Sequence, residues 1–200
     1  MHDTKRIGPD HRCLFGVAAT QKGHFTNSQA AACGFGRDDV AAHARTGRFI
    51  RERRGLYRLR DYPSDMHEEI MVAWLAVGRT IAVVSHQSAL ALHELSDVIP
   101  DAIHLTVPRS RRTHPNLLGT RIHTSSRPFG PLDVVTREGM RVTSPIRTVL
   151  DVDDLGLSLE HVEVAARQVI DRGQGAREMF TRRARGGRFL GDLESGRIHL

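Results

Sequence analysis

The sequence pattern changes at Gly47, and this change constrains the fold more than any other feature. Residues 37–46 carry apolar side chains at helical spacing and two aspartates in the first turn, where acidic groups complement the helix dipole. After Gly47, residues 48–51 and 56–59 have the composition of two short strands, and the intervening Glu-Arg-Arg-Gly supplies the turn. The chain is therefore predicted to form a helix that leads directly into a two-stranded hairpin.

Two short helices are expected before this pair. Residues 11–20 have apolar side chains at helical spacing. A second helix over SQAAAC (28–33) has a suitable N-cap in Thr26 or Asn27. Three helices followed by a basic hairpin are the order of a winged helix-turn-helix domain, which we place at residues 1–61.

Residues 62–200 are predicted to form a mixed α/β domain. A helix is expected to begin after Ser64 or Asp65, because Asp65 and Glu68 stand at capping-box spacing. The chain as a whole is thus expected to be α+β, with an N-terminal winged helix-turn-helix followed by a mixed α/β C-terminal domain. Strands are expected at 81–84, 102–107, 120–124, 132–137 and 140–143, and further helices at 85–95, from Ser144-Pro145 onward, and within 158–200.

The net charge lies in the first of these modules. The 200-residue chain has 29 Lys and Arg against 23 Asp and Glu, a formal net charge of +6. Residues 1–61 hold 12 basic against 6 acidic residues, whereas residues 62–200 hold 17 of each. A solvated basic face is one explanation. Because the charge coincides with a hairpin that follows a helix, we favour contact with DNA.

Arginine suits such a hairpin because its planar guanidinium holds phosphate oxygens through two parallel hydrogen bonds. In a winged helix the third helix enters the major groove and the wing lies along the flanking backbone. Phe49, Tyr57 and Leu59 are expected to pack the wing onto the helices. The predicted contacts are Arg48, Arg53, Arg54 and Arg58 to phosphates, with Arg37, His43 and Arg45 facing the groove from the third helix.

Two features of the second module each have a structural and a functional explanation. The loop PRSRRTHP (108–115) is basic, so Arg109, Arg111 and Arg112 are candidates for contact with DNA or with an acidic partner, and a plain solvated loop is the alternative. Arg147 and Asp151 are four residues apart and can pair on a helix surface, where exposed pairs contribute little to stability. The favoured interpretation is a structural pair that fixes this helix against the sheet. A role in contact with a partner is the alternative for this pair.

Catalytic and metal sites are not expected. Ser85 and Ser88 lie near histidines but lack the glycine elbow of serine hydrolases, and Ser85 is better placed as a helix cap. Residues 62–200 contain no lysine, which restriction-type nuclease sites use beside acidic metal ligands. The 12 histidines are irregularly spaced without an HExxH motif, so His86 and His93 are expected to be packed or hydrogen-bonded residues. We therefore expect no cofactor and no enzyme activity.

Cysteine usage and hydropathy indicate the compartment. Cys13 and Cys33 are expected to be small buried residues in a reducing cytoplasm rather than a disulfide, with the bridge as the alternative. No apolar run reaches the length of a membrane span, and MHDTKRIGPDHR lacks the apolar segment of a signal peptide. A cytoplasmic protein that makes no membrane contact is the expectation.

An ordered series of segments resembles a known family. RERRGLYRL is followed by VVSHQSALALHEL, IHLTVPRSRR, IHTS and GMRVTSPIRTVLD. In that order they resemble the AbiEi-type antitoxins of bacterial abortive-infection (type IV) toxin–antitoxin systems, which act in phage defence, and their orphan regulator relatives. The resemblance covers about residues 10–155. It is weak over residues 156–200, where many relatives carry a longer C-terminal region, so no role is assigned to that segment.

The resemblance implies a cytoplasmic protein that binds double-stranded operator DNA and represses its own operon. It also implies that the second domain counteracts a toxin of nucleotidyltransferase fold encoded next door, while the chain itself carries no catalytic residues. Two or more copies on repeated half-sites would supply the affinity that one small module lacks. Two alternatives stand beside this interpretation: a stand-alone regulator without a toxin, and an interaction protein that binds the toxin directly.

Overall fold

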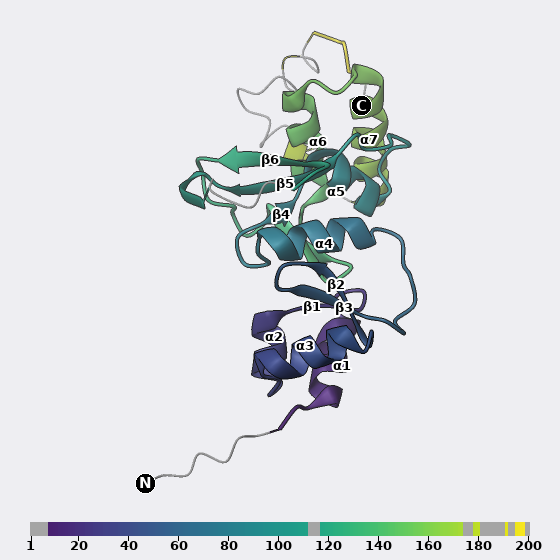
Figure 1. Cartoon of the computed structure of the whole chain (residues 1–200). Coiled ribbons are helices and arrows are strands. Elements are labelled where there is room, and N and C mark those ends of the chain that lie inside the picture. Colours follow the sequence, from purple (N-terminus) through teal and green to yellow (C-terminus); the bar gives the residue numbers. More distant parts are fainter. Residues whose placement is uncertain (1–7, 112–116, 174–177, 181–190, 192–194, 199–200) are drawn as a thin grey trace. The chain divides into compact units, whose positions relative to one another are not determined.

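The structure, a computed structural model, describes residues 8–111, 117–173, 178–180, 191 and 195–198. It is α+β, with an N-terminal winged helix-turn-helix and a C-terminal mixed sheet, as predicted (Figure 1). Contacts within the chain divide it into two compact units, Met1–Gly78 and Arg79–Leu200. The sequence pattern places the boundary between residues 61 and 62 instead. The difference is helix α4 (Glu68–Val77), which packs against two strands of the first unit and so belongs to it.

The first unit has three helices and a small antiparallel sheet before α4, which is its fourth helix. The sheet order is β1-β3-β2, so β3 is the central strand. Strand β1 was not predicted, because three residues are too few to show an alternating pattern. The elements before α4 are α1 (His11–Ala19), β1 (His24–Thr26), α2 (Asn27–Ala32), α3 (Arg37–Arg45), β2 (Phe49–Arg53) and β3 (Leu56–Leu59).

Side-chain caps determine where the two helices of the helix-turn-helix begin. Thr26 Oγ1 accepts a hydrogen bond from the backbone N–H of Gln29 at 3.3 Å, and Gln29 Oε1 accepts one from the Thr26 N–H at 2.9 Å. This is the complete capping box of α2, with Thr26 as the cap. At α3, Asp39 Oδ2 accepts from the Gly36 N–H at 2.8 Å. Local sequence therefore sets the start of both helices.

The core of the first unit lies between the helices and one face of the sheet. Register pairs Phe25 with Tyr57 and Phe49 with Leu59, so these four side chains share a face. Tyr57 and Leu59 pack against the core, and Phe49 belongs to it, which confirms the predicted anchoring of the wing. The buried members of this core are Leu14, Ala18, Phe25, Ala30, Cys33, Phe35, Val40 and Phe49.

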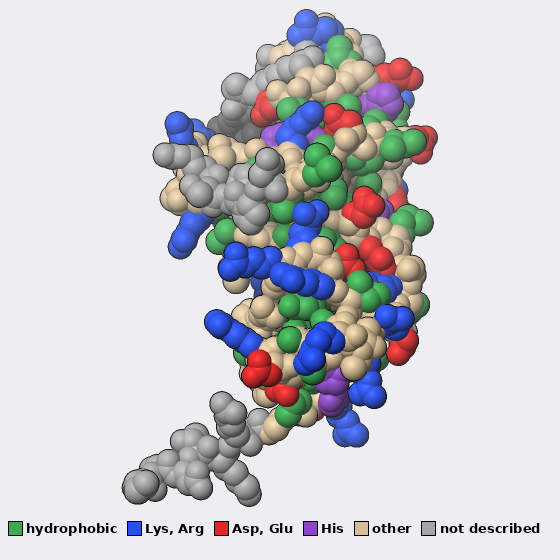
Figure 2. Space-filling view, viewed as in Figure 1, with side chains coloured by type: hydrophobic (Ala, Val, Ile, Leu, Met, Phe, Trp, Pro, Cys, Tyr) green, Lys and Arg blue, Asp and Glu red, His purple; other side chains and the backbone are tan. Residues whose placement is uncertain are grey.

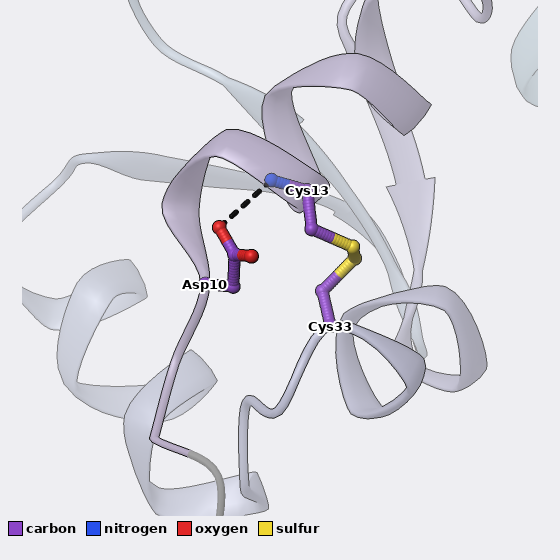
Figure 3. The surroundings of a disulfide bond; sticks show 3 residues. All are labelled: Asp10, Cys13 and Cys33. Carbon is purple, nitrogen blue, oxygen red and sulfur yellow. Dashed lines mark hydrogen bonds between the residues drawn. A yellow bond between two sulfur atoms is a disulfide. The ribbon is translucent and has the colours of Figure 1, made fainter.

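A disulfide joins α1 to the end of α2. Cys13 and Cys33 are bonded, with their Cα atoms 5.6 Å apart. Asp10 Oδ1 caps α1 by accepting from the Cys13 N–H at 3.0 Å (Figure 3). The expectation of two separate buried thiols was wrong. The residues meet because the Asp10 N–H donates to the Cys33 carbonyl at 2.9 Å, which brings the first turn of α1 against the end of α2.

Helix α4 begins later than its sequence signal suggests. Glu68 Oε1 does accept from the Asp65 N–H at 2.9 Å, which is one half of the predicted capping box. However, His67 is the N-cap and has a left-handed backbone with φ of 66°. The chain therefore enters the helix only at Glu68, and Met66, just before the N-cap, is 75% exposed.

The second unit is built on a five-stranded mixed sheet with the order β6-β5-β4-β8-β7. Pairs β4–β8 and β5–β6 are parallel, and β4–β5 and β7–β8 are antiparallel. Strand β4 is shorter than the predicted segment 81–84. The strands are β4 (Val83–Val84), β5 (Ile103–Pro108), β6 (Thr120–Ser125), β7 (Val134–Arg137) and β8 (Met140–Thr143).

Three helices of the second unit pack on one another. Helix α5 (His86–His93) contacts α6 (Pro145–Leu155), and α6 contacts α7 (Leu159–Arg172) (Figure 1). The apolar core that they share includes Leu90, Val149, Val162 and Phe180. Most of the predicted helical region after Arg172 lies outside the described residues. Among the helices described, none has both the length and the apolar character needed to cross a membrane.

Candidate nucleic-acid interface

The exposed cations of the first unit lie mainly on α3 and the wing. Figure 2 shows basic side chains spread over the face of this unit that is in view. Between residues 37 and 60 only three acidic residues accompany the arginines. The exposed arginines of this segment are Arg37, Arg45, Arg48, Arg51, Arg53, Arg54 and Arg60. The predicted phosphate contacts Arg48, Arg53 and Arg54 are thus accessible.

The wing is held to the helices through its backbone. The Asn27 N–H, at the start of α2, donates to the Gly55 carbonyl at 2.9 Å, and this bond fixes the tip of the hairpin. Gly55 has φ of 77°, a conformation that favours glycine at the turn. At the other end of the hairpin, the Arg60 N–H donates to the Arg48 carbonyl at 3.0 Å. The tip of the wing therefore has a defined position relative to α2, and its two arms are joined at the base.

An irregular register directs the arginines near the wing tip. Arg51 pairs with Tyr57 and Arg53 pairs with Leu56, so one extra residue lies in β2 between these pairs. A bulge of this kind bends a strand and changes the direction of its side chains. Arg53 and Arg54 follow the bulge and are exposed at the turn. The tip therefore carries two adjacent cations with access to an extended anion.

Arg51 was missing from the predicted contacts and belongs with them on structural grounds. It lies on β2 between Arg48 and Arg53 and is exposed. The signal was present in the sequence, because Arg51 belongs to the same arginine-rich run as Arg48, Arg53 and Arg54.

Arg58 was predicted to contact phosphate, and the structure places it elsewhere. Only 8% of its surface is exposed. Its Nη2 donates to the Tyr62 carbonyl at 2.7 Å and to Glu68 Oε1 at 3.2 Å. Alternation along the central strand β3 puts Arg58 on the face opposite Tyr57, and α4 packs on β3. The Arg58 guanidinium is held by these internal hydrogen bonds, so we no longer expect Arg58 to contact phosphate.

On α3, the arginines and the histidine differ. Arg37 and Arg45, at the two ends of the helix, are exposed as expected. His43 was expected to face outward but is half-buried, with its ring centroid 4.7 Å from that of Phe49. Burial lowers the pKa of His43, and nearby His11 and Arg48 lower it further. His43 is therefore neutral at pH 7 and packs on the core rather than offering a cation to DNA.

The residues that the sequence singled out in the second unit also differ in exposure and in role. Arg109 and Arg111 are exposed on a single 3-10 turn (Arg109–Arg111) that follows β5, and Arg112 lies outside the described residues. Ser85 occupies the N-cap position of α5, but its hydroxyl does not cap the helix. His93 Nε2 is hydrogen-bonded to the Thr143 carbonyl at 2.7 Å, in line with the expected structural role.

The Arg147–Asp151 pair is not the exposed pair that the sequence suggested. Arg147 Nε donates to Asp151 Oδ1 at 2.7 Å, and only 8% of the Asp151 side chain is exposed. Burial raises the pKa of Asp151 to about 6, although Arg147 opposes the shift. We therefore expect the pair to couple the interior of the second unit to pH.

Comparison with known proteins bears on the first unit. Residues 14–60 match the AbiEi_4 family model, described as "Transcriptional regulator, AbiEi antitoxin". Residues 14–60 are AbiEi-like. The AbiEi match runs from α1 to the end of the wing and so contains the complete helix-turn-helix and hairpin, and it confirms the resemblance predicted from the sequence over this segment.

Beyond that segment the comparisons are weaker. The crystal structure of the RV2827C protein from Mycobacterium tuberculosis is similar over 94% of this chain and 81% of that chain, with a TM-score of 0.45 and 15% sequence identity. This degree of likeness is too low to bear on fold or function. No curated protein matches the chain. The AbiEi match therefore supports an antitoxin-like regulator, and it does so through the first unit.

Proposed function

We propose that this chain is a non-enzymatic antitoxin that binds double-stranded operator DNA and represses its own operon. The observation that carries the proposal is the set of exposed arginines on α3 and the wing, inside the segment that matches a family of transcriptional regulators. An exposed basic surface supplies the sequence-independent part of DNA affinity by neutralising phosphates. The position of these arginines on a helix and an adjoining hairpin fits recognition of a duplex.

In the proposed complex, the two parts of the interface have different tasks. Helix α3 enters the major groove, with Arg37 and Arg45 at its ends. Arg48, Arg51, Arg53 and Arg54 hold phosphates beside the groove, where each guanidinium can donate two parallel hydrogen bonds. Phosphate contacts set the register of a protein on DNA and base contacts determine the sequence that it prefers. The backbone bonds that fix the wing would thereby align α3 with its half-site.

The second unit is proposed to counteract a toxin of nucleotidyltransferase fold encoded beside this gene. Support comes from the ordered segments VVSHQSALALHEL to GMRVTSPIRTVLD, which resemble AbiEi-type antitoxins. The exposed Arg109 and Arg111 are candidates for contact with that partner or with DNA. A stand-alone regulator is the second candidate, and it is favoured if no such gene lies next to this one.

Two measurements test the proposal. The first compares binding of the full chain to the DNA upstream of its own gene and to an unrelated duplex of equal length at the same ionic strength. Preference for the upstream fragment is expected, because regulators bind their operators at least a thousandfold more tightly than random DNA, to order of magnitude. Equal affinity for both fragments would contradict operator recognition.

The second measurement co-expresses the chain with the neighbouring protein, and rescue of growth is expected. Operator binding without rescue would leave a regulator that is not an antitoxin.

A further inference from the structure

Three histidines that are far apart in the sequence meet in the second unit. They are His86 at the start of α5, His104 on β5 and His123 on β6, and one ring nitrogen of each lies within 4.8 Å of the others. The parallel pairing of β5 with β6 produces this meeting, because Thr106 pairs with His123 and His104 is two residues before Thr106 on the same face. Among the residues that the structure describes, this is the group with the donor set and spacing for a metal ion.

Hydrogen bonds already orient two of the three rings. His86 Nδ1 lies 2.9 Å from Ser85 Oγ, whose hydroxyl is in turn 2.7 Å from Thr106 Oγ1. This arrangement directs Nε2 of His86 away from Ser85 as a ligand atom. His104 Nε2 lies 3.3 Å from Asp101 Oδ1, and its Nδ1 lies 3.1 Å from His123 Nε2. A carboxylate behind a histidine is the usual second partner of a metal-binding imidazole, since it fixes the tautomer and raises the basicity of the ligand.

The carboxylate of Asp101 is itself held in place. Its second oxygen, Oδ2, accepts a hydrogen bond from Arg121 Nη2 at 3.1 Å. Arg121 pairs with His104 across β5 and β6, so the arginine and the histidine reach the same acid from neighbouring strands. The rings of His86 and His123 are stacked at a centroid distance of 3.7 Å. Because a metal ion lies in the plane of each imidazole that binds it, the half-buried His123 ring would have to turn out of this stack on ligation.

The surroundings of the cluster suit ligation. His104 is fully buried and His86 is 8% exposed, while His123 is half-buried and gives access from solvent. In addition, His86 has φ of 52°, an uncommon conformation for a residue other than glycine, and such outliers occur often at functional sites.

We propose that His86, His104 and His123 bind one divalent transition-metal ion of the zinc class. Zinc is held by histidine nitrogens at about 2.0–2.1 Å, which in a tetrahedral site places pairs of nitrogens roughly 3.3 Å apart. The 3.1 Å between His104 Nδ1 and His123 Nε2 is close to that spacing. Three histidines leave a fourth position for water or for a donor from a partner. The ion would fasten the start of α5 to strands β5 and β6 and so stabilise the second unit.

The test uses the full chain without a polyhistidine tag, purified in chelator and then titrated with Zn²⁺. We expect about one ion per chain, and an unfolding temperature raised by roughly 5–10 °C when Zn²⁺ reaches a hundred times its dissociation constant. Titration with Co²⁺ should give the intense visible absorption of a tetrahedral nitrogen site. The key variant is His123→Gln, since this ring is the most accessible of the three, and it should lose both the ion and the rise in unfolding temperature that Zn²⁺ produces over the variant's own metal-free state.

Two further variants separate a built site from casual binding to histidines. Asp101→Asn keeps all three ligands and should weaken Zn²⁺ binding by about 10- to 100-fold, because only the orienting carboxylate changes. His161→Gln changes a half-buried histidine on α7, outside the cluster, and should bind Zn²⁺ as the unaltered chain does. Failure of the unaltered chain to bind Zn²⁺, or equal binding by His123→Gln, would overturn the proposal and leave a hydrogen-bonded cluster. The site lies within the second unit, so either result is independent of DNA binding.

Discussion

Arg58 Nη2 donates a 3.2 Å hydrogen bond to Glu68 Oε1, and this contact joins the central strand of the wing sheet to the first turn of α4. An arginine that looks like part of a phosphate-binding strip is thus part of the interior. Lys22, in the loop before β1, also forms an internal ion pair: its ammonium lies 2.7 Å from Oδ2 of Asp65, which precedes α4. The charge of the first unit therefore has two functions: some cations hold α4, and the exposed ones remain for a polyanion.

The first prediction concerns stability. Arg58→Met should destabilise the protein by about 2 kcal/mol, because it leaves the Tyr62 carbonyl and the Glu68 carboxylate without their buried donor. This loss is below the usual range for a fully buried pair, since the Glu68 side chain is 24% exposed. Urea denaturation measures the loss. DNA affinity at a temperature where the variant is folded should change little, and a large loss of affinity with unchanged stability would return Arg58 to the interface.

The second prediction concerns the wing tip. Arg53→Ala combined with Arg54→Ala should lower the slope of log affinity against log salt by about 2, one for each phosphate that the wing no longer neutralises. Both side chains are exposed, so the unfolding temperature should stay within about a degree of the original. Fluorescence anisotropy over a series of salt concentrations measures the slope.

A matched double variant controls for net charge in that experiment. Arg79→Ala with Arg127→Ala removes two exposed arginines from the second unit and changes the total charge equally. Its salt slope should remain that of the unaltered chain. If the two double variants give equal slopes, the effect comes from net charge rather than from the wing, and the wing assignment fails.

Local signals were sufficient for much of the first unit. Thr26 and Gln29 make the capping box that their spacing indicates, and Gly55 turns the hairpin. The burial of Arg58 could not be predicted from the hairpin pattern alone. Alternation shows that Arg58 and Tyr57 face opposite sides, but only the packing of α4 on β3 shows that both sides are covered.

Contacts between residues far apart in the chain could not be predicted from their spacing in the sequence. His104 and His123 approach each other because β5 and β6 are parallel and paired in one particular register. A shift of one residue would turn His123 to the other face of the sheet. Cys13 and Cys33 likewise meet only through the packing of α1 on α2. Neither relation leaves a local pattern in the sequence.

The third prediction concerns the disulfide. The bridge spans a sequence separation of 20, and closing a loop of that size should stabilise the folded chain by about 3 kcal/mol through the entropy of the unfolded state. Unfolding in reductant should therefore occur at a lower urea concentration than unfolding without it. The exposed position of Cys13 makes the bond accessible to reductant.

The control for the disulfide experiment is Cys13→Ala combined with Cys33→Ala, whose stability should not respond to reductant. Titration of free thiols in the untreated chain provides an independent readout. Two reactive thiols, together with equal stability in the presence and absence of reductant, would show that the bridge does not form in solution.

The fourth prediction concerns pH. Burial raises the pKa of Asp151 to about 6 in the folded chain, against about 3.9 for an unfolded aspartate. Between these values the folded state binds the proton and the unfolded state does not, so stability falls as pH rises and stays low above pH 6. The decrease amounts to at most about 3 kcal/mol. Asp151→Asn cannot titrate and should lack this component.

The measurement is the difference in unfolding free energy between Asp151→Asn and the unaltered chain at pH values from 4 to 7. Taking the difference removes titrations that the two chains share, including those of the histidines. The difference should shift in favour of Asp151→Asn as pH rises, because the variant never bears the cost of a buried charge. Asp97→Asn, at an exposed position of the same unit, is the matched control and should give a flat difference. A flat difference for Asp151→Asn as well would mean that Arg147 compensates the buried carboxylate fully, and that the pair does not couple the second unit to pH.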